Sequence, residues 1–144
     1  TRLLARGLIP VNVTGGGLIT ALRELALKSE EIFRIRCRLE CPLRVRVSSP
    51  ETATHLYRIA QESISNAVRH GKATEILIEL RTKDNRLCLA ITDNGAGIPQ
   101  PLPRTEGMGL RIMQHRAGMI RATLDVRLRT EGGTKVKCTL SHPL

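Results

Sequence analysis

Two stretches in which apolar and polar residues alternate, each interrupted by one short turn, constrain the fold of this chain more than any other feature. In each stretch, two runs of strand-like residues flank the turn: residues 75–82 and 86–92 around Lys83-Asp84-Asn85, and residues 123–130 and 134–140 around Glu131-Gly132-Gly133. Because so short a turn joins antiparallel neighbours, both stretches predict hairpins. Most of the sheet is therefore expected to be antiparallel.

Three other stretches carry apolar residues at helical spacing. They cover residues 18–32, a long stretch from Pro50 to His70, and residues from about Met108 to Arg121. Gly71 is placed to stop the second of these helices. The sequence therefore predicts three amphipathic helices, each with one face toward a core.

One further strand is expected between the first two helices. Residues 33–41 alternate between apolar and charged side chains, as in a strand with one buried face, and residues 43–47 fit either a second short strand or an extended loop. The order is then helix, strand, helix, two strands, helix, two strands. This order predicts an α+β fold, a two-layer α/β sandwich whose mixed, mostly antiparallel sheet has helices on one face.

Length and charge leave several classes of partner open. The 144 residues suit one domain, and the net charge of +10 fits either a polyanionic partner, such as nucleic acid or an acidic protein surface, or a solvated arginine-rich surface. With one Tyr, one Phe and no Trp, the chain lacks stacking platforms for single-stranded nucleic acid. No apolar run approaches the roughly 18 residues of a membrane span.

Four cysteines raise the question of zinc or disulfides. Three residues separate Cys37 from Cys41, but no second Cys or His pair completes a ligand set at finger spacing. Each of the four, with Cys88 and Cys138, is expected on the apolar phase of a strand. They are therefore predicted to be reduced core cysteines in a cytoplasmic protein.

The long helix carries polar residues that could act together. Glu62, Asn66 and His70 follow one another at steps of four, with Arg69 beside them, and this spacing stacks side chains along one edge of a helix. Asn66 together with phosphate oxygens would suffice to hold magnesium, which keeps several waters. The same residues would also fit the solvated side of an ordinary amphipathic helix.

Asp93 ends a buried strand and is followed by two glycines. A carboxylate in the interior is unfavourable unless a group donates to it. A nucleobase amino group would serve, and Gly95 and Gly97 would leave space for a flat ring; an Asx turn that closes the strand would serve equally well.

A glycine pair also stands near the start of the third helix, in Gly107-Met108-Gly109-Leu110. Backbone N–H groups at a helix start favour an anion, although such glycines also fit a flexible helix entry. Neither the phosphate loop nor the dinucleotide fingerprint is present, so a nucleotide would need a different cradle.

Taken in order, these motifs resemble the ATP-binding catalytic domain of bacterial sensor histidine kinases, within the gyrase-like (Bergerat) ATPase superfamily. The stretches "HLYRIAQESISNAVRHGKA" (55–73) and "GMGLRIMQHRAGMI" (107–120) are most similar to the nitrate-sensor/DegS-like branch, and the resemblance covers residues 50–141. It implies the Bergerat fold for residues 33–144, with residues 1–32 as a connecting segment and the tail of a missing dimerisation region.

The resemblance also implies roles for residues of the long helix. Asn66 would be the magnesium ligand, and Glu62 the catalytic acid that orients or deprotonates the attacking group. Arg69 and His70 fall where the family places phosphate contacts. The implied cofactors are ATP and Mg²⁺.

The remaining implied residues surround the nucleotide. Asp93 would accept the adenine amino group, and Thr134 would lie near adenine. The rest line the base pocket or close over the phosphates: Gly95, Gly97, Gly107, Met108, Gly109 and Leu110.

The chain departs from the family pattern in its histidines and in its lid, which is short and lacks the phenylalanine-containing motif of other kinase branches. Its histidines all lie within or after the resembling module, and no phosphoacceptor motif or dimerising hairpin is visible: His55, His70, His115 and His142. The expected function is phosphoryl transfer from ATP to a histidine on a helical domain absent from this chain, with that domain and a response regulator as partners. The alternatives are a non-kinase ATPase or ATP-gated switch of the same fold, or a basic module that binds nucleic acid or an acidic partner.

Overall fold

The computed structural model describes residues 17–41, 45–47, 49–97 and 104–141, with the backbone alone for residues 104–108. Three helices and five strands follow one another in it: α2 (Gly17–Phe33), β1 (Arg36–Glu40), α3 (Pro50–Arg69), β2 (Glu75–Lys83), β3 (Arg86–Asp93), α4 (Arg104–Met119), β4 (Thr123–Leu128) and β5 (Thr134–Ser141). This order confirms the predicted succession of helices and strands.

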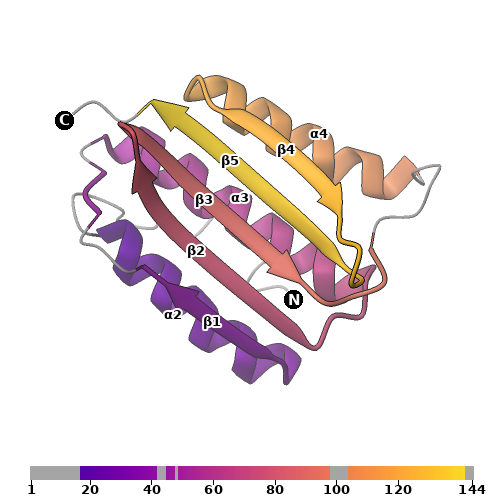
Figure 1. The fold of residues 1–144 in the computed structure, drawn as a ribbon. Coiled ribbons are helices and arrows are strands. Elements are labelled where there is room, and N and C mark those ends of the chain that lie inside the picture. Colours follow the sequence, from indigo (N-terminus) through magenta and orange to yellow (C-terminus); the bar gives the residue numbers. More distant parts are fainter. Residues whose placement is uncertain (1–16, 42–44, 48, 98–103, 142–144) are drawn as a thin grey trace.

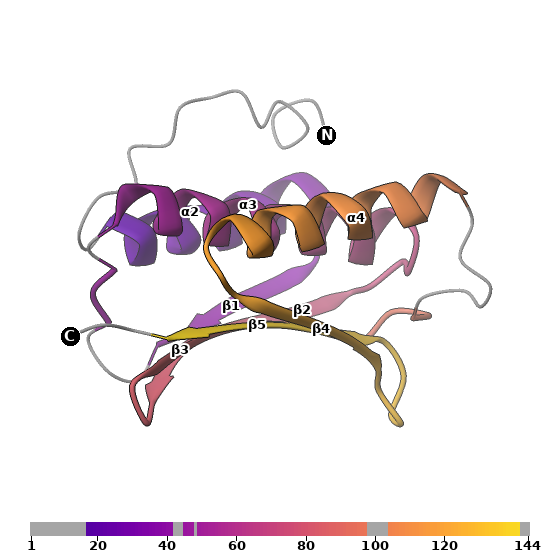
Figure 2. The same ribbon diagram turned by 90° about the horizontal axis from the view of Figure 1, so that it is seen from above.

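The five strands form one sheet in the order β1-β2-β3-β5-β4. Strand β1 pairs with β2 in parallel, and the other three pairs are antiparallel. Figure 1 shows the helices lying along the sheet, and Figure 2 shows all three on the same face of it. The predicted two-layer sandwich with a mixed, mostly antiparallel sheet is therefore confirmed.

The core between the two layers is aliphatic. It is built from side chains of every helix and of all strands except β4, and the largest fully buried ones are Leu18, Leu22, Leu25, Leu56, Ile59, Ile64, Ile78, Leu80, Leu87, Leu89, Ile91 and Met113. Helix α2 belongs to this core through its leucines. Burial of each such side chain contributes about 1.5–3 kcal/mol, so the near absence of aromatics is compensated by the number of aliphatic residues.

Helix α3, which carries most of the candidate polar residues, is fixed at both ends by its sequence. The Ser49 side chain accepts a hydrogen bond from the Thr52 N–H at 3.2 Å, and Pro50 occupies the first turn, where its missing N–H does no harm. The helix ends at Arg69 with His70 as its cap. A Cβ on Gly71 would lie 2.9 Å from the Ala67 carbonyl oxygen, so glycine suits this exit.

Both predicted hairpins are present. Asp84 and Asn85 have φ values of 53° and 60° and form the two-residue turn between β2 and β3, of the kind that matches the twist of the strands. Gly132 and Gly133, with φ values of 104° and 91°, turn the chain between β4 and β5. The alternation of the flanking strands sets which face each side chain occupies.

Three predicted boundaries were wrong. Strand β1 begins at Arg36 rather than residue 33, because α2 continues to Phe33 and Arg34 then takes a φ of 55°. Helix α4 begins at Arg104 and ends at Met119, so it starts four residues before the predicted Met108. The breakers Pro99, Pro101 and Pro103 predict a loop over residues 98–106, but residues 104–106 belong to α4, and residues 98–103 lie outside the described residues.

The cysteines are reduced, as predicted, but only two are core residues. Cys37 and Cys138 are buried, and burial raises the pKa of each thiol to about 12. Cys88 was expected on the apolar phase of its strand, and this was wrong: the neighbouring Leu87 and Leu89 point into the core, so Cys88 is half-buried on the opposite face.

The chain between β1 and α3 is described only in part. Val45 and Val47 are buried, and Val47 forms an isolated bridge rather than a strand. Across the described ranges, none of the helices combines the length and apolar character that crossing a bilayer would require.

Candidate functional site

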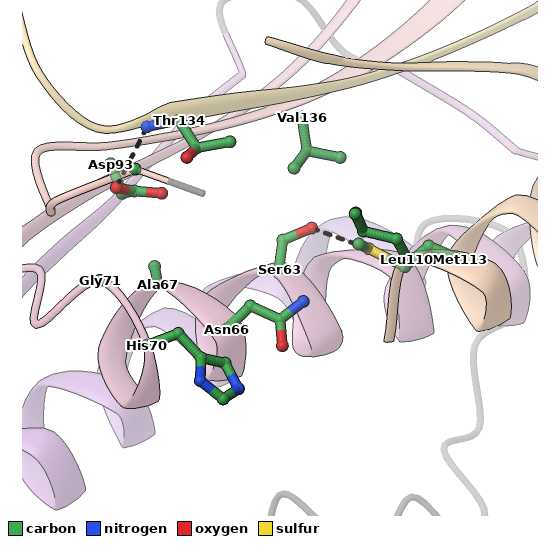
Figure 3. A pocket seen from close by; sticks show the side chains of 11 residues that line it. Ser63, Asn66, Ala67, His70, Gly71, Asp93, Leu110, Met113, Thr134 and Val136 are labelled. Atoms are coloured by element: carbon green, nitrogen blue, oxygen red, sulfur yellow. Dashed lines mark hydrogen bonds between the residues drawn. The ribbon is translucent and has the colours of Figure 1, made fainter. Parts of the chain in front are cut away.

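A cavity opens between the helix layer and the sheet, next to the end of β3. Its lining comes from α3, from α4 and from the strand ends: Ser63, Asn66, Ala67, His70, Gly71, Asp93, Gly97, Leu110, Met113, Thr134 and Val136. Figure 3 shows Asp93 and Thr134 on the sheet side of this cavity and Asn66 and His70 on α3. The structure thus brings Asn66 and Asp93, 27 positions apart in the sequence, to one cavity.

Asp93 is the buried acid of the site. The residue is only 7% exposed. Its Oδ1 accepts hydrogen bonds from the backbone N–H of Gly95 at 2.8 Å and of Thr134 at 3.3 Å. Among the described residues, no group donates to Oδ2. Burial raises the pKa of this carboxyl, and the two backbone donors oppose that shift.

Both alternatives for Asp93 are compatible with this geometry. The bond from the Gly95 N–H to Oδ1 is an Asx turn, which closes the strand as one alternative required. The second oxygen remains an acceptor at the cavity, as the other alternative required. One carboxylate can therefore shape the turn and meet a donor on a ligand at the same time.

The backbone around Asp93 is packed too closely for side chains. The Ala96 N–H donates to the Gly71 carbonyl at 2.8 Å, and a Cβ on Gly95 would lie 2.6 Å from that same oxygen. A Cβ on Gly133, which has a φ of 91°, would overlap the Asp93 carbonyl. These glycines bring the ends of α3, β3 and β5 together at the cavity.

Asn94 and Arg129 fix this region from two sides. The Asn94 Oδ1 accepts from the Thr74 and Glu75 N–H groups, both at 2.9 Å, which ties the end of β3 to the start of β2. The Arg129 Nη1 donates to the Asp93 carbonyl at 2.9 Å and to the Gly132 carbonyl at 3.3 Å. The β4–β5 turn is thereby attached to the backbone of the buried acid.

Glu62 and Asn66 form a second polar group where α3 meets α4. A Cβ on Gly109 would lie 2.9 Å from the Glu62 Oε2 and 3.2 Å from the Asn66 Nδ2. The Arg69 Nη2 lies 3.8 Å from the Glu62 Oε2. Burial raises the pKa of Glu62, and the positive charges of Arg69, Arg116 and His70 oppose this shift. With glycine at position 109, both polar side chains can lie against α4 without having to shift.

The other expected residues are placed as follows. His70 and Leu110 line the cavity, whereas Arg69 is exposed and reaches the site through its ion pair with Glu62. Gly107 and Met108 lie in the first two turns of α4, and their surroundings are outside the described residues.

The earlier start of α4 changes the expectation for its glycines. Gly107 is the fourth residue of the helix and Gly109 the sixth. Only the first four N–H groups of a helix lack an internal partner. Counted from the cap residue before Arg104, these four N–H groups end at residue 106, so neither glycine supplies one of them, and Gly109 instead provides space against Glu62 and Asn66.

Sequence reasoning missed several residues of the site. Four of them line the cavity from core positions: Ser63, Ala67, Met113 and Val136. Ser63 and Ala67 continue the apolar face of the long helix, so their spacing predicts core positions, and the same face also lines the cavity. Arg129 was missed because nothing in its neighbourhood of sequence indicates that it reaches Asp93.

The donor set suits a metal only together with a ligand. Among the residues that the structure describes, no group of three or more His, Cys, Asp and Glu side chains could hold a metal ion. The Asn66 oxygen and the nearby Glu62 carboxylate are hard ligands of the type that magnesium accepts. They would leave most coordination positions to phosphate oxygens and water, as magnesium prefers.

The chain is similar in sequence to a known family and to proteins of that family. Residues 51–144 match the family described as "Histidine kinase-, DNA gyrase B-, and HSP90-like ATPase". The chain is 34% identical over 129 residues to the nitrate/nitrite sensor protein NarX of Escherichia coli (strain K12), which is 90% of this chain and 22% of NarX. It is 31% identical over 138 residues to the sensor protein NarQ homolog of Haemophilus influenzae, or 93% of this chain and 24% of that protein. The chain thus spans less than a quarter of each relative's length.

A solved structure shows the same fold. The ATP binding domain of PrrB from Mycobacterium tuberculosis superposes with a TM-score of 0.71 at 22% identity, over 94% of this chain and 98% of that one. At this identity the likeness concerns the arrangement of helices and strands, which is the sandwich described above.

Proposed function

The chain belongs to the family of histidine kinase-, DNA gyrase B- and HSP90-like ATPases, and on that premise we propose that it is the ATP-binding catalytic domain of a two-component sensor histidine kinase. In this proposal it passes the γ-phosphoryl group of ATP to a histidine on a helical domain outside this chain. The observation that supports it best is the single cavity shared by Asp93 and Asn66.

Asp93 would recognise the adenine end of the nucleotide. Its free oxygen faces the cavity, and the exocyclic amino group of adenine is a donor of matching character. Apolar side chains on both sides, among them Met113 and Val136, suit the faces of a flat ring. Guanine carries a carbonyl at the corresponding position, so the carboxylate would disfavour it.

Asn66, His70 and the start of α4 would hold the phosphate end. Asn66 would share a magnesium ion with phosphate oxygens, and that ion supplies positive charge against the phosphates when it is bound. His70 lines the same cavity, and Arg69 stands one residue before it. The free N–H groups of the first turn of α4 favour an anion.

Glu62 would act on the attacking histidine. A neutral imidazole nitrogen forms the bond to the γ-phosphorus, the bond to the bridging oxygen of ADP breaks, and its electron pair leaves with ADP. The proton on the other ring nitrogen must then be released, and a carboxylate whose pKa burial has raised is a suitable acceptor. Glu62 would therefore orient this imidazole and take its proton.

The partners follow from the same proposal. The acceptor histidine would lie on the kinase's own dimerisation and phosphoacceptor domain, and a response regulator would receive the phosphoryl group next. The domain would work in the cytoplasm, where ATP is available, and needs no contact with nucleic acid.

Titration of the purified chain with Mg-ATP and Mg-GTP tests the pocket. We expect ATP to bind and GTP to bind at least tenfold more weakly, and Asp93→Asn to weaken ATP binding by roughly 1–3 kcal/mol, because the adenine amino group then faces a donor as well as an acceptor. Asp125→Asn, an exposed carboxylate of β4, is the matched control. Unchanged ATP affinity in Asp93→Asn would contradict the adenine assignment.

Phosphohistidine formation separates the kinase from a non-kinase ATPase of the same fold. The full-length protein should transfer phosphate from ATP to one of its own histidines. Hydrolysis of ATP without any phosphohistidine would favour the ATPase instead.

A further inference from the structure

A cluster of basic side chains lies on α3 and α4 beside the proposed site. It consists of His55 and Arg58 on α3 and His115 and Arg116 on α4, and is called the basic cluster below. The Arg116 Nη1 lies 3.5 Å from the His55 Nδ1, so the two helices meet there through basic groups. None of these residues lines the cavity.

The cluster brings several basic groups close together, and Arg58 also donates from Nη1 to the Gln61 Oε1 at 3.1 Å. The pKa of His55 is lowered by burial and by Arg116, and that of Arg58 by burial and again by Arg116; His115 adds a smaller effect on His55. The Glu51 Oε1 lies 4.0 Å from the His55 Nε2 with its side chain 65% exposed, and Arg116 also acts on the Glu62 carboxylate, where its charge opposes the rise in pKa that burial causes. An anion placed here would therefore be favoured by several groups at once.

The basic cluster lies on the same contact between α3 and α4 as Glu62 and Asn66. Gly109 on α4 meets Asn66 and Glu62, whereas Arg116, two turns later, meets His55, two turns earlier on α3. The two helices thus run antiparallel, and residues 66, 62 and 58 follow one another along one edge of α3 at steps of four. The basic cluster continues the line from Asn66 through Glu62, away from the cavity.

Exposed apolar side chains flank the same edge of α4. Ile112 is 42% exposed and Met119 is 52% exposed, and they stand four residues before and three residues after Arg116. Such spacing places all three side chains on one stripe of the helix. Apolar anchors beside charged groups are typical of surfaces that bind protein, whereas a free anion needs only the charges.

We propose that the basic cluster docks acidic side chains of the protein segment that carries the acceptor histidine. This inference rests on the proposed function. A segment that presents a histidine to Glu62 must also cover the neighbouring turns of α3, where His55 and Arg58 lie, and the facing turns of α4, where His115 and Arg116 lie. Carboxylates on that segment find complementary charge there, and Ile112 and Met119 receive its apolar side chains.

The full-length kinase provides the test. Arg116→Gln and, separately, Arg58→Gln should lower the rate of phosphohistidine formation at saturating ATP by about tenfold, while the Kd for ATP changes less than twofold. Arg127→Gln, an exposed arginine of β4 that pairs with Asp125, removes the same charge elsewhere and should change neither quantity. Thermal unfolding of each variant checks that the fold is kept.

A charge reversal identifies the docked group. Arg116→Glu should lose transfer more severely, and replacing one acidic residue of the acceptor segment with Arg should restore at least part of the lost rate. Unchanged transfer in Arg116→Gln and Arg58→Gln would overturn the inference. An equal loss of ATP affinity, or a failure of every such reversal to restore the rate, would overturn it as well.

The proposed function fails in a different way. If the unaltered full-length protein binds ATP but forms no phosphohistidine, the kinase assignment is wrong. If transfer occurs and is indifferent to the basic cluster, only the present inference is wrong.

Discussion

At the scale of single residues, Asp93 engages the backbone through one oxygen of its carboxylate. Oδ1 accepts from two backbone N–H groups and holds the turn, and Oδ2 is left at the cavity. The sequence predicted that this acid is buried, because it ends an apolar alternation, but it could not decide between turn and ligand. The structure shows the turn, which uses Oδ1, and the ligand role of the other oxygen stays a prediction.

The metal role of Asn66 predicts a specific dependence. Asn66→Ala should weaken Mg-ATP binding by on the order of tenfold, or ~1.4 kcal/mol, because the protein oxygen shared with the ion is lost. Binding of ATP in the presence of a chelator should change little. Calorimetry with and without magnesium measures both, with the exposed Gln114→Ala on α4 as the control. An equal loss under both conditions would show that Asn66 contacts the nucleotide directly.

Arg129 is predicted to position Asp93. Arg129→Gln removes the bonds to the Asp93 and Gly132 carbonyls and should weaken ATP binding by roughly 1–2 kcal/mol. Its charge also helps to lower the pKa of Asp93. The acid limb of ATP binding should therefore move to higher pH in the variant, as measured by calorimetry across pH.

Two further variants test the same idea about Arg129. Arg129→Lys keeps the charge but not the two-pronged donor, so it should recover the pH profile and only part of the affinity. Arg127→Gln is the surface control. A loss of affinity without any shift of the pH profile would indicate a structural role alone.

At the scale of elements, α4 differs most from its prediction. Apolar periodicity became visible only from Met108, so the first turn, which follows Pro99, Pro101 and Pro103, was assigned to a loop. A helix can begin before its apolar stripe does, since its first turn needs no buried face. This earlier start turns Gly109 from a terminal glycine into a point of contact with α3.

Two glycines of α4 give a matched pair of substitutions. Gly118→Ala adds a Cβ with nothing within 4 Å, so it should stabilise the helix by up to about 1 kcal/mol and leave ATP binding unchanged. Gly109→Ala gains similar helix propensity, but its Cβ would force Glu62 and Asn66 to move. We expect weaker Mg-ATP binding only in Gly109→Ala. Urea unfolding and calorimetry measure the two effects, and equal ATP affinities for the two variants would contradict the contact.

At the scale of the whole molecule, local sequence patterns predicted the two layers, but they did not predict which strands lie next to each other in the sheet. The hairpins and the common face of the helices follow from alternation and periodicity within short segments. The parallel pairing of β1 with β2, and the insertion of β5 between β3 and β4, join segments far apart in the sequence. No short-range pattern distinguishes these neighbours, whereas the position of Cys88 on the opposite face follows from its local alternation with Leu87 and Leu89.

The two buried acids predict how stability depends on pH. Burial raises the pKa of Asp93 and of Glu62 above their unfolded values. The stability linked to each group is fully present below about pH 4, near the unfolded pKa, and is lost as pH rises through the folded pKa. Asp93→Asn and Glu62→Gln should therefore be more stable than the unaltered chain at pH 7, by an amount that shrinks toward pH 4.

Urea unfolding at several pH values measures this difference, and Asp125→Asn serves as the surface control. If the variants were stabilised equally at pH 4.5 and at pH 7, ionisation of these acids would not oppose folding. The expected pattern would show that both acids, when ionised, lower the stability of the fold.

The two buried cysteines can report on local opening of the sheet. Cys37 lies on β1 at one border of the sheet and Cys138 on β5 near the other, and a thiol with a pKa of about 12 hardly forms the thiolate that alkylating reagents attack. Each becomes reactive only when its strand separates from the helix layer. Alkylation followed over time would thus reveal which border of the domain opens first, without any label being introduced.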